Sequence, residues 1–300
     1  MSVSIDHASA DQPRHTAAPG ATATDGSGTR SDIPSVEVDG VSVRFGAIKA
    51  LSDVTFTVQP GTIHAVIGPN GAGKSTMFNV LSGVYAAAEG EVRFGEARLT
   101  AMRPYKIADL GVARAFQNIA LSGSQTVAEN LMLGRHHLTK AGFLSSGLRL
   151  PSATREGKRH GARVAEIADF MELGAKLHTP VGVLSYGDQK RVEVARALCT
   201  EPRLLLLDEP VAGMNAEETR RMAAAILEIR DALGISIVLV EHDMGMVMGV
   251  ADRVTVLDFG RRIADGTPAQ VQSDPEVIRA YLGSGDEEPQ AGATDPEGPA

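Results

Sequence analysis

A glycine-rich segment with one lysine and two hydroxyl residues carries the clearest chemical signal in this chain. Residues 68–76 fit the pattern G-x-x-x-x-G-K-[ST], whose backbone N–H groups turn inward around phosphate oxygens. The helix expected to begin near Lys74 adds the positive end of its dipole to the same place. Lys74 is expected to reach the β- and γ-phosphates, and the Ser75 hydroxyl to bind Mg²⁺. The predicted nucleotide-binding residues are Gly68, Pro69, Asn70, Gly71, Ala72, Gly73, Lys74, Ser75 and Thr76.

The flanking sequence separates this segment from a glycine-rich turn that fits the pattern by chance. The apolar run 63–67 reads as a buried strand, and apolar residues within 77–81 indicate a helix directly after the loop. A strand, a phosphate loop and a helix in this order predict binding of a nucleoside triphosphate.

A second element places two acids at the end of an apolar run. Residues 204–207 are all leucine and are followed by Asp208 and Glu209. The run is far shorter than the roughly 20 residues of a membrane span, so it reads as a central parallel strand. Ligands bind at the carboxyl ends of such strands, so we expect Asp208 to face the Mg²⁺ and Glu209 the attacking water. The alternative is a buried strand followed by a solvated acidic turn.

A third segment offers another site for an anion. Residues 184–189 read Leu-Ser-Tyr-Gly-Asp-Gln and precede a helix with an apolar face over 192–198. Ser185, an exposed Gly187 and a helix N-terminus together could bind a phosphate. A single phosphate-loop enzyme has no evident use for a second such site.

With these residues in view, the chain resembles the ATP-binding cassette (ABC) family, in which the segment 184–189 is the signature motif. The order and spacing agree across residues 36–283. Phe45 stands where the family has the aromatic that stacks on adenine, Gln117 at its Q-loop and His242 at its switch histidine. Taken alone, Gln117 would read as a solvated loop residue and His242 as structural. Phe45 could equally be a core aromatic, because apolar residues alternate over 41–45.

The resemblance extends to the ATPases of bacterial branched-chain amino acid importers, and importers of other hydrophobic amino acids, amides and urea share much of the pattern. The segments that carry it are 116–118 (FQN), a basic insertion after 135–137, 212–215 (AGMN), 217–219 (EET), 241–244 (EHDM) and 277–283 (VIRAYLG). The chain departs from the general family at Tyr186 and Asp188 of the signature, although tyrosine suits this subfamily. Asn215 stands where many cassettes have the aspartate of the D-loop, which puts its cross-subunit role in doubt.

The implied fold is an α/β P-loop NTPase of the ATP-binding cassette type, with a RecA-like core, an antiparallel β subdomain and a helical signature subdomain. Patterns within the chain add antiparallel strands over 36–60 and 90–99, and a helix from Pro275 to Leu282 capped by Asp274. We expect the cassette to span 35–283, between a disordered extension over 1–34 and a disordered acidic tail over 284–300. Its expected parts are 36–103 for the β subdomain and phosphate loop, 104–200 for the helical subdomain, 201–258 for the catalytic core and 259–283 for a C-terminal segment.

The activity implied by the resemblance is ATP hydrolysis by phosphoryl transfer to water. Glu209 would polarise the water, His242 would contact the γ-phosphate, and Lys74 would neutralise developing charge. Ser75 and Gln117 would ligate Mg²⁺, with Asp208 holding it through water. The implied catalytic residues are Glu209, His242, Gln117 and Lys74; the metal residues are Ser75, Gln117 and Asp208; the other nucleotide contacts are Phe45, Ser185 and Gly187.

The partners follow from the resemblance alone. Ser185 and Gly187 would complete the site of a second ABC ATPase, either a paralogue or a second copy. Integral-membrane permease subunits would use the resulting switch, with a substrate-binding protein as an indirect partner. The chain would then work at the cytoplasmic face of the cell membrane.

Composition is compatible with that account. The chain has 300 residues with 43% hydrophobic content, and its mean hydropathy is −0.04. No stretch approaches the ~20 apolar residues of a membrane span, and the first 34 residues lack the apolar core of a signal peptide. The single cysteine, Cys199, falls on an apolar helix, which indicates a buried thiol in a reducing compartment.

Charge argues against nucleic acid as a partner. The net charge is −8, of which residues 1–34 (four Asp, two Arg) and 284–300 (five acids, no base) supply −7. The remainder is nearly neutral and lacks the broad basic surface that nucleic acid requires. One segment, 135–163, has seven Lys or Arg and a single Glu. It is either a solvated surface or a contact for anionic lipid headgroups or loops of a membrane partner.

A different class of function stays open, namely a cassette ATPase of DNA repair, translation or iron–sulfur assembly. Repair cassettes carry long coiled coils, and no sustained heptads lie between Gln117 and Ser185. Translation-type cassettes carry two phosphate loops in one chain, and this chain has one. The motifs do not separate a transport ATPase from an assembly scaffold.

Overall fold

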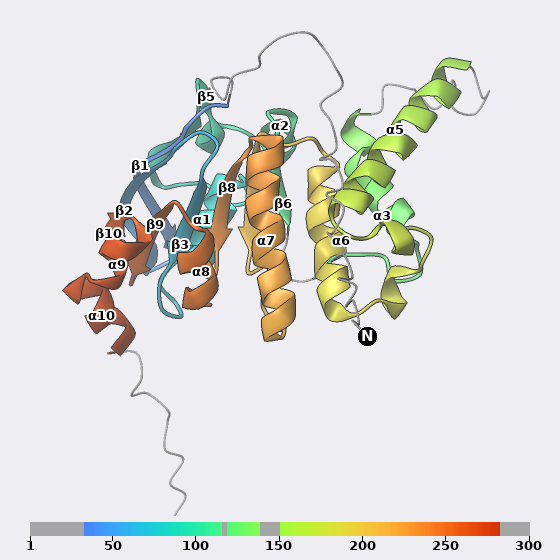
Figure 1. Cartoon of the computed structure of the whole chain (residues 1–300). Coiled ribbons are helices and arrows are strands. Elements are labelled where there is room, and N and C mark those ends of the chain that lie inside the picture. The colour runs from blue at the N-terminus through green and yellow to red at the C-terminus, as the bar shows by residue number, and fades with distance from the viewer. Residues whose placement is uncertain (1–32, 116–118, 139–150, 283–300) are drawn as a thin grey trace, which may run out of the picture.

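The computed structural model describes residues 33–115, 119–138 and 151–282, which form two sheets and the helices that cover them (Figure 1). The strands are β1 (Val36–Phe45), β2 (Ile48–Val58), β3 (Ile63–Ile67), β4 (Glu89–Phe94), β5 (Ala97–Arg98), β6 (Val112–Ala115), β7 (Leu204–Asp208), β8 (Ser236–Val240), β9 (Arg253–Asp258) and β10 (Arg261–Gly266). The α-helices are α1 (Lys74–Leu81), α2 (Pro104–Asp109), α3 (Val127–Gly134), α5 (Pro151–Phe170), α6 (Tyr186–Leu198), α7 (Ala216–Leu233), α8 (Met244–Val250), α9 (Pro268–Gln272) and α10 (Pro275–Leu282).

The smaller sheet is antiparallel, with strand order β2-β1-β4-β5. Strand β1 pairs with β2 (Val36 opposite Val58) and with β4 (Val36 opposite Phe94). Val36 and Val38 are buried while Glu37 between them is exposed, as expected for a sheet with one covered face. The antiparallel strands predicted over 36–60 and 90–99 are confirmed.

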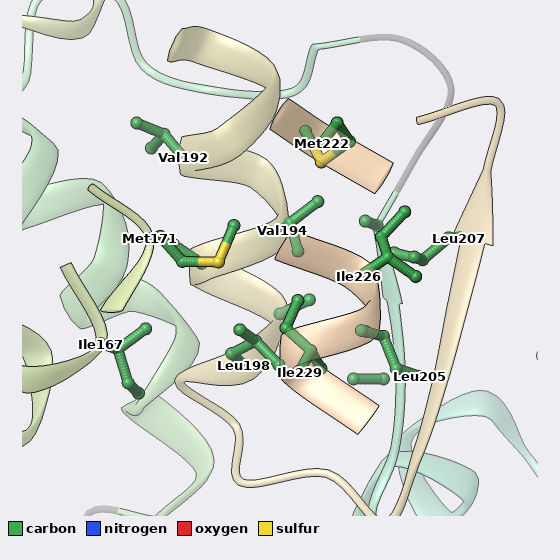
Figure 2. Close-up of a cluster of buried hydrophobic side chains, with 14 of the residues drawn as sticks. Ile167, Met171, Val192, Val194, Leu198, Leu205, Leu207, Met222, Ile226 and Ile229 are labelled. Atoms are coloured by element: carbon green, nitrogen blue, oxygen red, sulfur yellow. The ribbon is translucent and has the colours of Figure 1, made fainter. Parts of the chain in front are cut away.

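The larger sheet has the order β10-β9-β3-β8-β7-β6, parallel except for the pair β9 and β10. Strand β7 lies between β6 and β8 and is buried throughout, because helices cover both faces of the sheet. Leu204 and Leu206 pack with helix α1 on one face. Leu205 and Leu207 pack with α6 and α7 on the other, where Val194, Ile226 and neighbouring side chains fill the space (Figure 2). The predicted parallel core strand is confirmed.

Two parts of the core sheet were missed. The region from 104 to 200 was expected to be mostly helical and no strand was predicted in it, yet β6 lies there and pairs with β7 (Val112 opposite Leu204). Its four residues, Val-Ala-Arg-Ala, are too few and too mixed to give a strand pattern. Strand β10 lies beyond residue 258, the expected end of the catalytic core, and completes the other edge of the sheet by pairing with β9. Strands β6 and β10 therefore lie outside the segments in which strands of the core sheet were expected.

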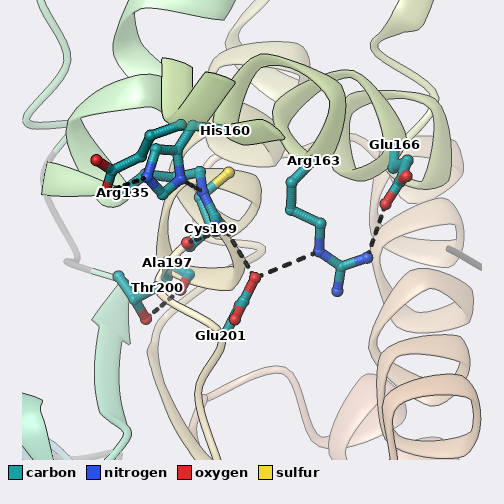
Figure 3. A network of polar contacts seen from close by, with 9 residues as sticks. Arg135, His160, Arg163, Glu166, Ala197, Cys199, Thr200 and Glu201 are labelled. Carbon is teal, nitrogen blue, oxygen red and sulfur yellow. Dashed lines mark hydrogen bonds and ion pairs between the residues drawn. The ribbon is translucent and has the colours of Figure 1, made fainter. Parts of the chain in front are cut away.

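The helical region is tied together by a polar network around Arg135 (Figure 3). Arg135 is buried and donates from Nε to His160 Nδ1 (2.7 Å) and from Nη1 to the Cys199 carbonyl (3.1 Å) and Glu201 Oε1 (2.9 Å). Arg163 lies 3.7 Å from the same Glu201 oxygen. At these two positions the basic segment 135–163 is neither solvated nor facing lipid, because its guanidinium groups join α5 to the ends of α3 and α6.

The thiol of Cys199 lies inside this region, as predicted. It is buried, and burial raises its pKa to about 12. A thiol with so high a pKa stays protonated and unreactive at neutral pH.

Replacing Arg135 by Met should destabilise the chain by about 3 kcal/mol, because His160, the Cys199 carbonyl and Glu201 each lose a donor. Thermal unfolding should show a fall of several degrees in Tm. The control is Arg159→Met on the exposed side of α5, which should leave Tm nearly unchanged. Equal Tm values for the two variants would contradict a structural role for the network.

The ends of the chain, 1–32 and 283–300, lie outside the described residues, so the disorder expected there stays a prediction. At the C-terminal side, α10 begins where it was expected, and Asp274 Oδ1 caps it by accepting from the N–H groups of Glu276 (2.8 Å) and Val277 (3.4 Å). Within the part of the chain that the structure describes, none of the helices has the length and apolar character needed to cross a membrane.

Candidate nucleotide-binding site

The loop between β3 and α1 forms the cradle that the sequence predicted. Gly68 and Gly73 have φ values of 150° and 101°, which side chains rarely adopt. A Cβ at Gly68 would come within 2.1 Å of the Leu257 carbonyl, and one at Gly73 within 2.9 Å of the Ala50 carbonyl. Positions 68 and 73 therefore both require glycine, because the loop lies directly against neighbouring backbone at these points.

The ammonium group of Lys74 lies inside this cradle. Nζ donates to the carbonyls of Gly68 (2.6 Å) and Pro69 (2.9 Å), and the residue is only 9% exposed. Burial lowers the pKa of Lys74, and the Glu209 carboxylate opposes that shift. The two side chains are thus close enough to interact, although they lie 135 positions apart in the sequence.

The first turn of α1 has free backbone donors beside the lysine. Gly73 caps the helix without a side-chain hydrogen bond, so the N–H groups of the first turn have no capping partner. Asn70 and Ser75 are exposed here, whereas Pro69 and Thr76 are half-buried. Together with the helix dipole, these groups provide a site for phosphate oxygens.

Asp208 ends β7 and pairs with a residue that sequence reasoning missed. Its Oδ2 accepts from Arg114 Nη2 at 2.7 Å, and the same guanidinium donates from Nη1 to Asn79 Oδ1 at 2.7 Å and Ser82 Oγ at 3.0 Å. The other oxygen, Oδ1, is buried and has no hydrogen-bond partner among the described residues. A buried carboxylate oxygen without a partner is costly, so this atom fits an additional ligand such as a metal-bound water.

Glu209 follows directly and its backbone is held in an unusual conformation. Its φ is 49°, in the left-handed region, and its N–H donates to the Val240 carbonyl at 2.9 Å. Such a conformation costs free energy unless the surroundings enforce it, and it is frequent at functional sites. The half-buried carboxylate is the one whose charge acts on Lys74.

His242 lies just beyond the end of the adjacent strand, β8. Its side chain is 63% exposed, and its Nδ1 lies 3.8 Å from Glu241 Oε2. Its backbone N–H donates to that same oxygen at 3.1 Å. From the sequence, Glu241 was named only as part of the segment 241–244, and no role was predicted for it. The sequence did offer one signal for a role of Glu241, namely an acid directly between the apolar run 237–240 and the histidine of the motif.

Phe45 ends β1 and is 46% exposed. Its ring packs edgewise on Tyr85, with 5.1 Å between centroids and 73° between planes. The ring is thus held on one side by another aromatic and remains accessible, as a stacking surface requires. Adenine stacking stays a prediction.

The signature segment corrects one expectation. Ser185 is exposed and caps α6, accepting from the Asp188 N–H at 3.2 Å and donating to Asp188 Oδ2 at 3.0 Å. Gly187, expected to be exposed, is buried. A Cβ there would meet Glu218 Oε1 at 2.7 Å, so the glycine lets α6 pack closely against the first turn of α7.

Asp188 brings a negative charge to this segment, and the charge of Lys176 compensates it. It forms an ion pair with Lys176, and its pKa is lowered: burial alone would raise it, and the hydrogen bonds from Lys176 and Ser185 outweigh that effect. Asn215, at the D-loop position, accepts from the N–H groups of Glu217 and Glu218, both at 3.0 Å, and caps α7. In this structure the Asn215 side chain therefore acts as the N-cap of α7.

Gln117 lies outside the described residues, so its predicted roles are not tested. The chain beyond it is anchored at Ala120, whose N–H donates to Glu193 Oε1 at 2.8 Å and whose carbonyl accepts from Arg196 Nη1 at 2.7 Å. Both partners lie on α6, so the helix that follows the signature segment holds the chain that follows Gln117.

The structure brings four of the predicted site residues together at the carboxyl ends of β3, β7 and β8. Lys74, Asp208, Glu209 and His242 all lie at these strand ends. The signature segment belongs to α6, which packs on the face of the core sheet opposite to α1. Ser185 therefore does not join the phosphate loop of its own chain.

Comparison with known proteins agrees with this geometry. The family model described as "ABC transporter" matches residues 51–212, and one described as "Branched-chain amino acid ATP-binding cassette transporter" matches 261–287. The high-affinity branched-chain amino acid transport ATP-binding protein LivG of Escherichia coli K12 is 40% identical over 250 residues, which cover 83% of this chain and 98% of the relative. BraF of Pseudomonas aeruginosa, described in the same words, is 38% identical over the same shares.

Solved structures give the same result. A nucleotide-free ATP-binding cassette of an ABC transporter superposes with a TM-score of 0.72 at 31% identity, covering 83% of this chain and 98% of that one. A cassette in its ADP conformation gives 0.73, also at 31% identity, with 84% and 99% covered.

Fold, site and similarity together define the class: the chain belongs to the ABC transporter family and is an ATPase that hydrolyses ATP for transport. Within that family it belongs to the ATP-binding proteins of the branched-chain amino acid transporter type.

Proposed function

We propose that this chain powers the import of branched-chain amino acids from the cytoplasmic face of the membrane, as one of two cassettes bound to integral-membrane subunits. The observation that carries the mechanism is the arrangement of Lys74, Asp208 and Glu209 around one phosphate loop. The proposed substrate class rests on the relatives, which are described as transporting branched-chain amino acids. Amide or urea import is the alternative.

A magnesium ion fits the residues at this site. Asp208 Oδ1 is a buried oxygen without a partner, and the Ser75 hydroxyl is exposed at the start of α1. We propose that Ser75 and Gln117 ligate Mg²⁺ and that Asp208 holds it through water. Bound there, the ion would neutralise charge on the β- and γ-phosphate oxygens.

Hydrolysis then needs a positioned water and charge stabilisation. The Glu209 carboxylate accepts a hydrogen bond from the water and orients it toward the γ-phosphorus, while the bond from phosphorus to the ADP oxygen breaks. Lys74 exchanges its carbonyl partners for phosphate oxygens, and the exposed His242 contacts the γ-phosphate. The positions of these side chains at the strand ends support the proposed roles, and single substitutions should separate binding from turnover.

A second cassette is proposed because the signature segment cannot serve its own phosphate loop. Ser185 and Gly187 lie at the start of α6, on the face of the sheet opposite to α1. Closure of two cassettes head to tail would bring Ser185 to the nucleotide of the partner. ATP would then hold the two chains together, and its hydrolysis would release them.

Ser185→Arg should block hydrolysis at the nucleotide bound by the opposite cassette, because a long cation would occupy the shared site. Binding of ATP to this chain's own loop should be unchanged. Mixing Ser185→Arg with Lys74→Ala chains tests the arrangement: a homodimer recovers partial activity through one intact site, while an obligate heterodimer shows no rescue. Parent-level turnover by Ser185→Arg alone would contradict a shared site.

An apolar cavity supports a proposed docking place for the membrane subunit. It has a volume of about 550 Å³ and lies among α2, β6, α3 and α6. Its lining includes Val84, Ile107, Val112, Leu133, Ala197 and Arg196. Val84 and Leu133 are 54% and 55% exposed, and both line this same cavity, so their exposed aliphatic surface is grouped rather than scattered. We propose that a helix from a cytoplasmic loop of a permease subunit packs into this cavity.

Val84→Arg combined with Leu133→Arg should leave the ATPase activity of the isolated chain within about twofold of the parent, since neither residue contacts the nucleotide site. Recovery in complex with the membrane subunits should fall at least about tenfold, because two charges would be buried in an apolar contact. The control is Leu282→Arg, at an exposed leucine (74%) on α10. Equal recovery of all three proteins would contradict docking at the cavity.

The proposed function is tested by co-expression with the integral-membrane subunits and the second cassette of a branched-chain amino acid transporter. A stable complex that hydrolyses ATP supports the transport assignment. Recovery of the chain free of every membrane subunit, with full activity, would favour the assembly-scaffold alternative.

A further inference from the structure

Glu241 is a fully buried carboxylate at the carboxyl end of β8, between the last strand residue and the exposed His242. Its exposed fraction is 0%. Burial raises its pKa, and hydrogen bonds from the backbone N–H groups of Val211 and His242 oppose that shift. Carboxylates are almost never buried completely unless they are paired, so the partners of this one need an explanation.

Those partners come from two different loops. Oε1 accepts from the N–H of Val211 at 2.8 Å, and Oε2 accepts from the N–H of His242 at 3.1 Å. Val211 lies two residues after Glu209 in the loop that follows β7, whereas His242 and Asp243 lie in the loop that follows β8. One side chain therefore bonds both loops that carry predicted catalytic groups.

A second contact makes the link rigid. The N–H of Glu209 donates to the carbonyl of Val240 at 2.9 Å, and Glu209 has a φ of 49°. The turn from Glu209 to Val211 is thus held at its first residue by Val240 and at its last by Glu241. A displacement of either loop must disturb the other.

We propose that Glu241 is a positioning residue that fixes the carboxylate of Glu209 and the imidazole of His242 relative to each other around the γ-phosphate. This inference rests on the proposed function, because it takes those two side chains as the groups that act on water and phosphate. Glu241 itself does not touch the nucleotide; it acts through the backbone of the two loops.

The chemistry of the side chain explains why a carboxylate suits this place. Both of its oxygens accept hydrogen bonds, and charge-assisted bonds of this kind are stronger than neutral ones. Glutamine has the same shape, but its amide nitrogen is a donor and would face a backbone N–H. Glu241→Gln therefore releases one loop while keeping the volume. A misplacement of about 1 Å in a catalytic group can lower a rate by about 100-fold.

A matched control lies at the other end of the same strand. Ser236 begins β8, is 1% exposed, and its Oγ accepts from the N–H of Gly61 at 2.9 Å. Ser236→Ala removes a buried acceptor of a backbone N–H, as Glu241→Gln does, but far from the carboxyl ends of the strands. Both variants should lower Tm, so Tm alone does not test the proposal.

The test measures kcat, the KM for ATP, the dissociation constant of a fluorescent ATP analogue, and Tm for each variant. Glu241→Gln should lower kcat by about 10- to 100-fold with nucleotide affinity within about threefold of the parent. Ser236→Ala should keep the parent kcat. The inference is overturned if folded Glu241→Gln keeps kcat within about twofold of the parent, or if both variants lose kcat equally.

A second measurement, a double-mutant cycle, separates positioning by Glu241 from a general loss of stability. If Glu241 acts through the loop of His242, adding Glu241→Gln to His242→Ala should lower kcat by much less than it does in the parent. Independent, multiplied losses would contradict the proposal. Failure of the proposed function is distinguishable, because Glu209→Gln and His242→Ala would then keep parent turnover by themselves.

Discussion

Glu209→Gln should bind ATP with nearly the parent affinity and hydrolyse it at least about 100-fold more slowly, within the range expected for loss of a general base. The substitution keeps the shape of the side chain and leaves the N–H bond to the Val240 carbonyl in place. It removes the carboxylate that polarises the water. Steady-state phosphate release and the affinity for a fluorescent ATP analogue measure the two quantities separately.

The matched control for this variant is Glu228→Gln. Glu228 is exposed on α7 and takes part in none of the ion pairs among the described residues. It should keep both binding and turnover. Hydrolysis by Glu209→Gln at the parent rate would show that another group activates the water. The variant should also accumulate as an ATP-bound dimer, which size-exclusion chromatography can detect.

Lys74→Ala should fail at the earlier step, with a loss of at least about 100-fold in affinity for ATP, because a charge-assisted contact to two phosphates disappears. In the structure Lys74 is 9% exposed, and within the described residues its ammonium group donates hydrogen bonds to the carbonyls of Gly68 and Pro69. These carbonyls are weaker partners than phosphate oxygens. Equilibrium titration with a fluorescent nucleotide measures the loss.

The control for Lys74 is Lys158→Ala, at an exposed lysine on α5. Its nucleotide affinity should match that of the parent. If Lys74→Ala also bound ATP with parent affinity, the phosphate loop would not be the nucleotide site. The two variants Lys74→Ala and Glu209→Gln thus separate the binding step from the chemical step.

Much of the site could be predicted because its residues are local in sequence. The loop 68–76 follows an apolar run, and Asp208 follows another, so strand ends alone place them at one edge of a parallel sheet. The glycines at 68 and 73 are required by close backbone contacts that the motif already encodes.

The groups that were missed depend on contacts between distant segments. Arg114 bonds Asp208 across β6 and β7, and β6 itself was too short to recognise. Glu241 bonds Val211 across two loops. Gly187 was expected to be exposed, but α6 and α7 pack together at that point. No periodicity within one segment reveals such pairs, because their chemistry depends on the partner that the fold supplies.

Uptake of leucine by proteoliposomes tests the central claim most directly. The vesicles would contain this chain, its second cassette and the permease subunits, with ATP inside on the cassette side and the substrate-binding protein outside. The account predicts ATP-dependent accumulation of leucine, isoleucine or valine, which is lost when Glu209→Gln replaces the parent chain. Hydrolysis of ATP without accumulation of any branched-chain amino acid, or equal uptake with Glu209→Gln, would contradict it.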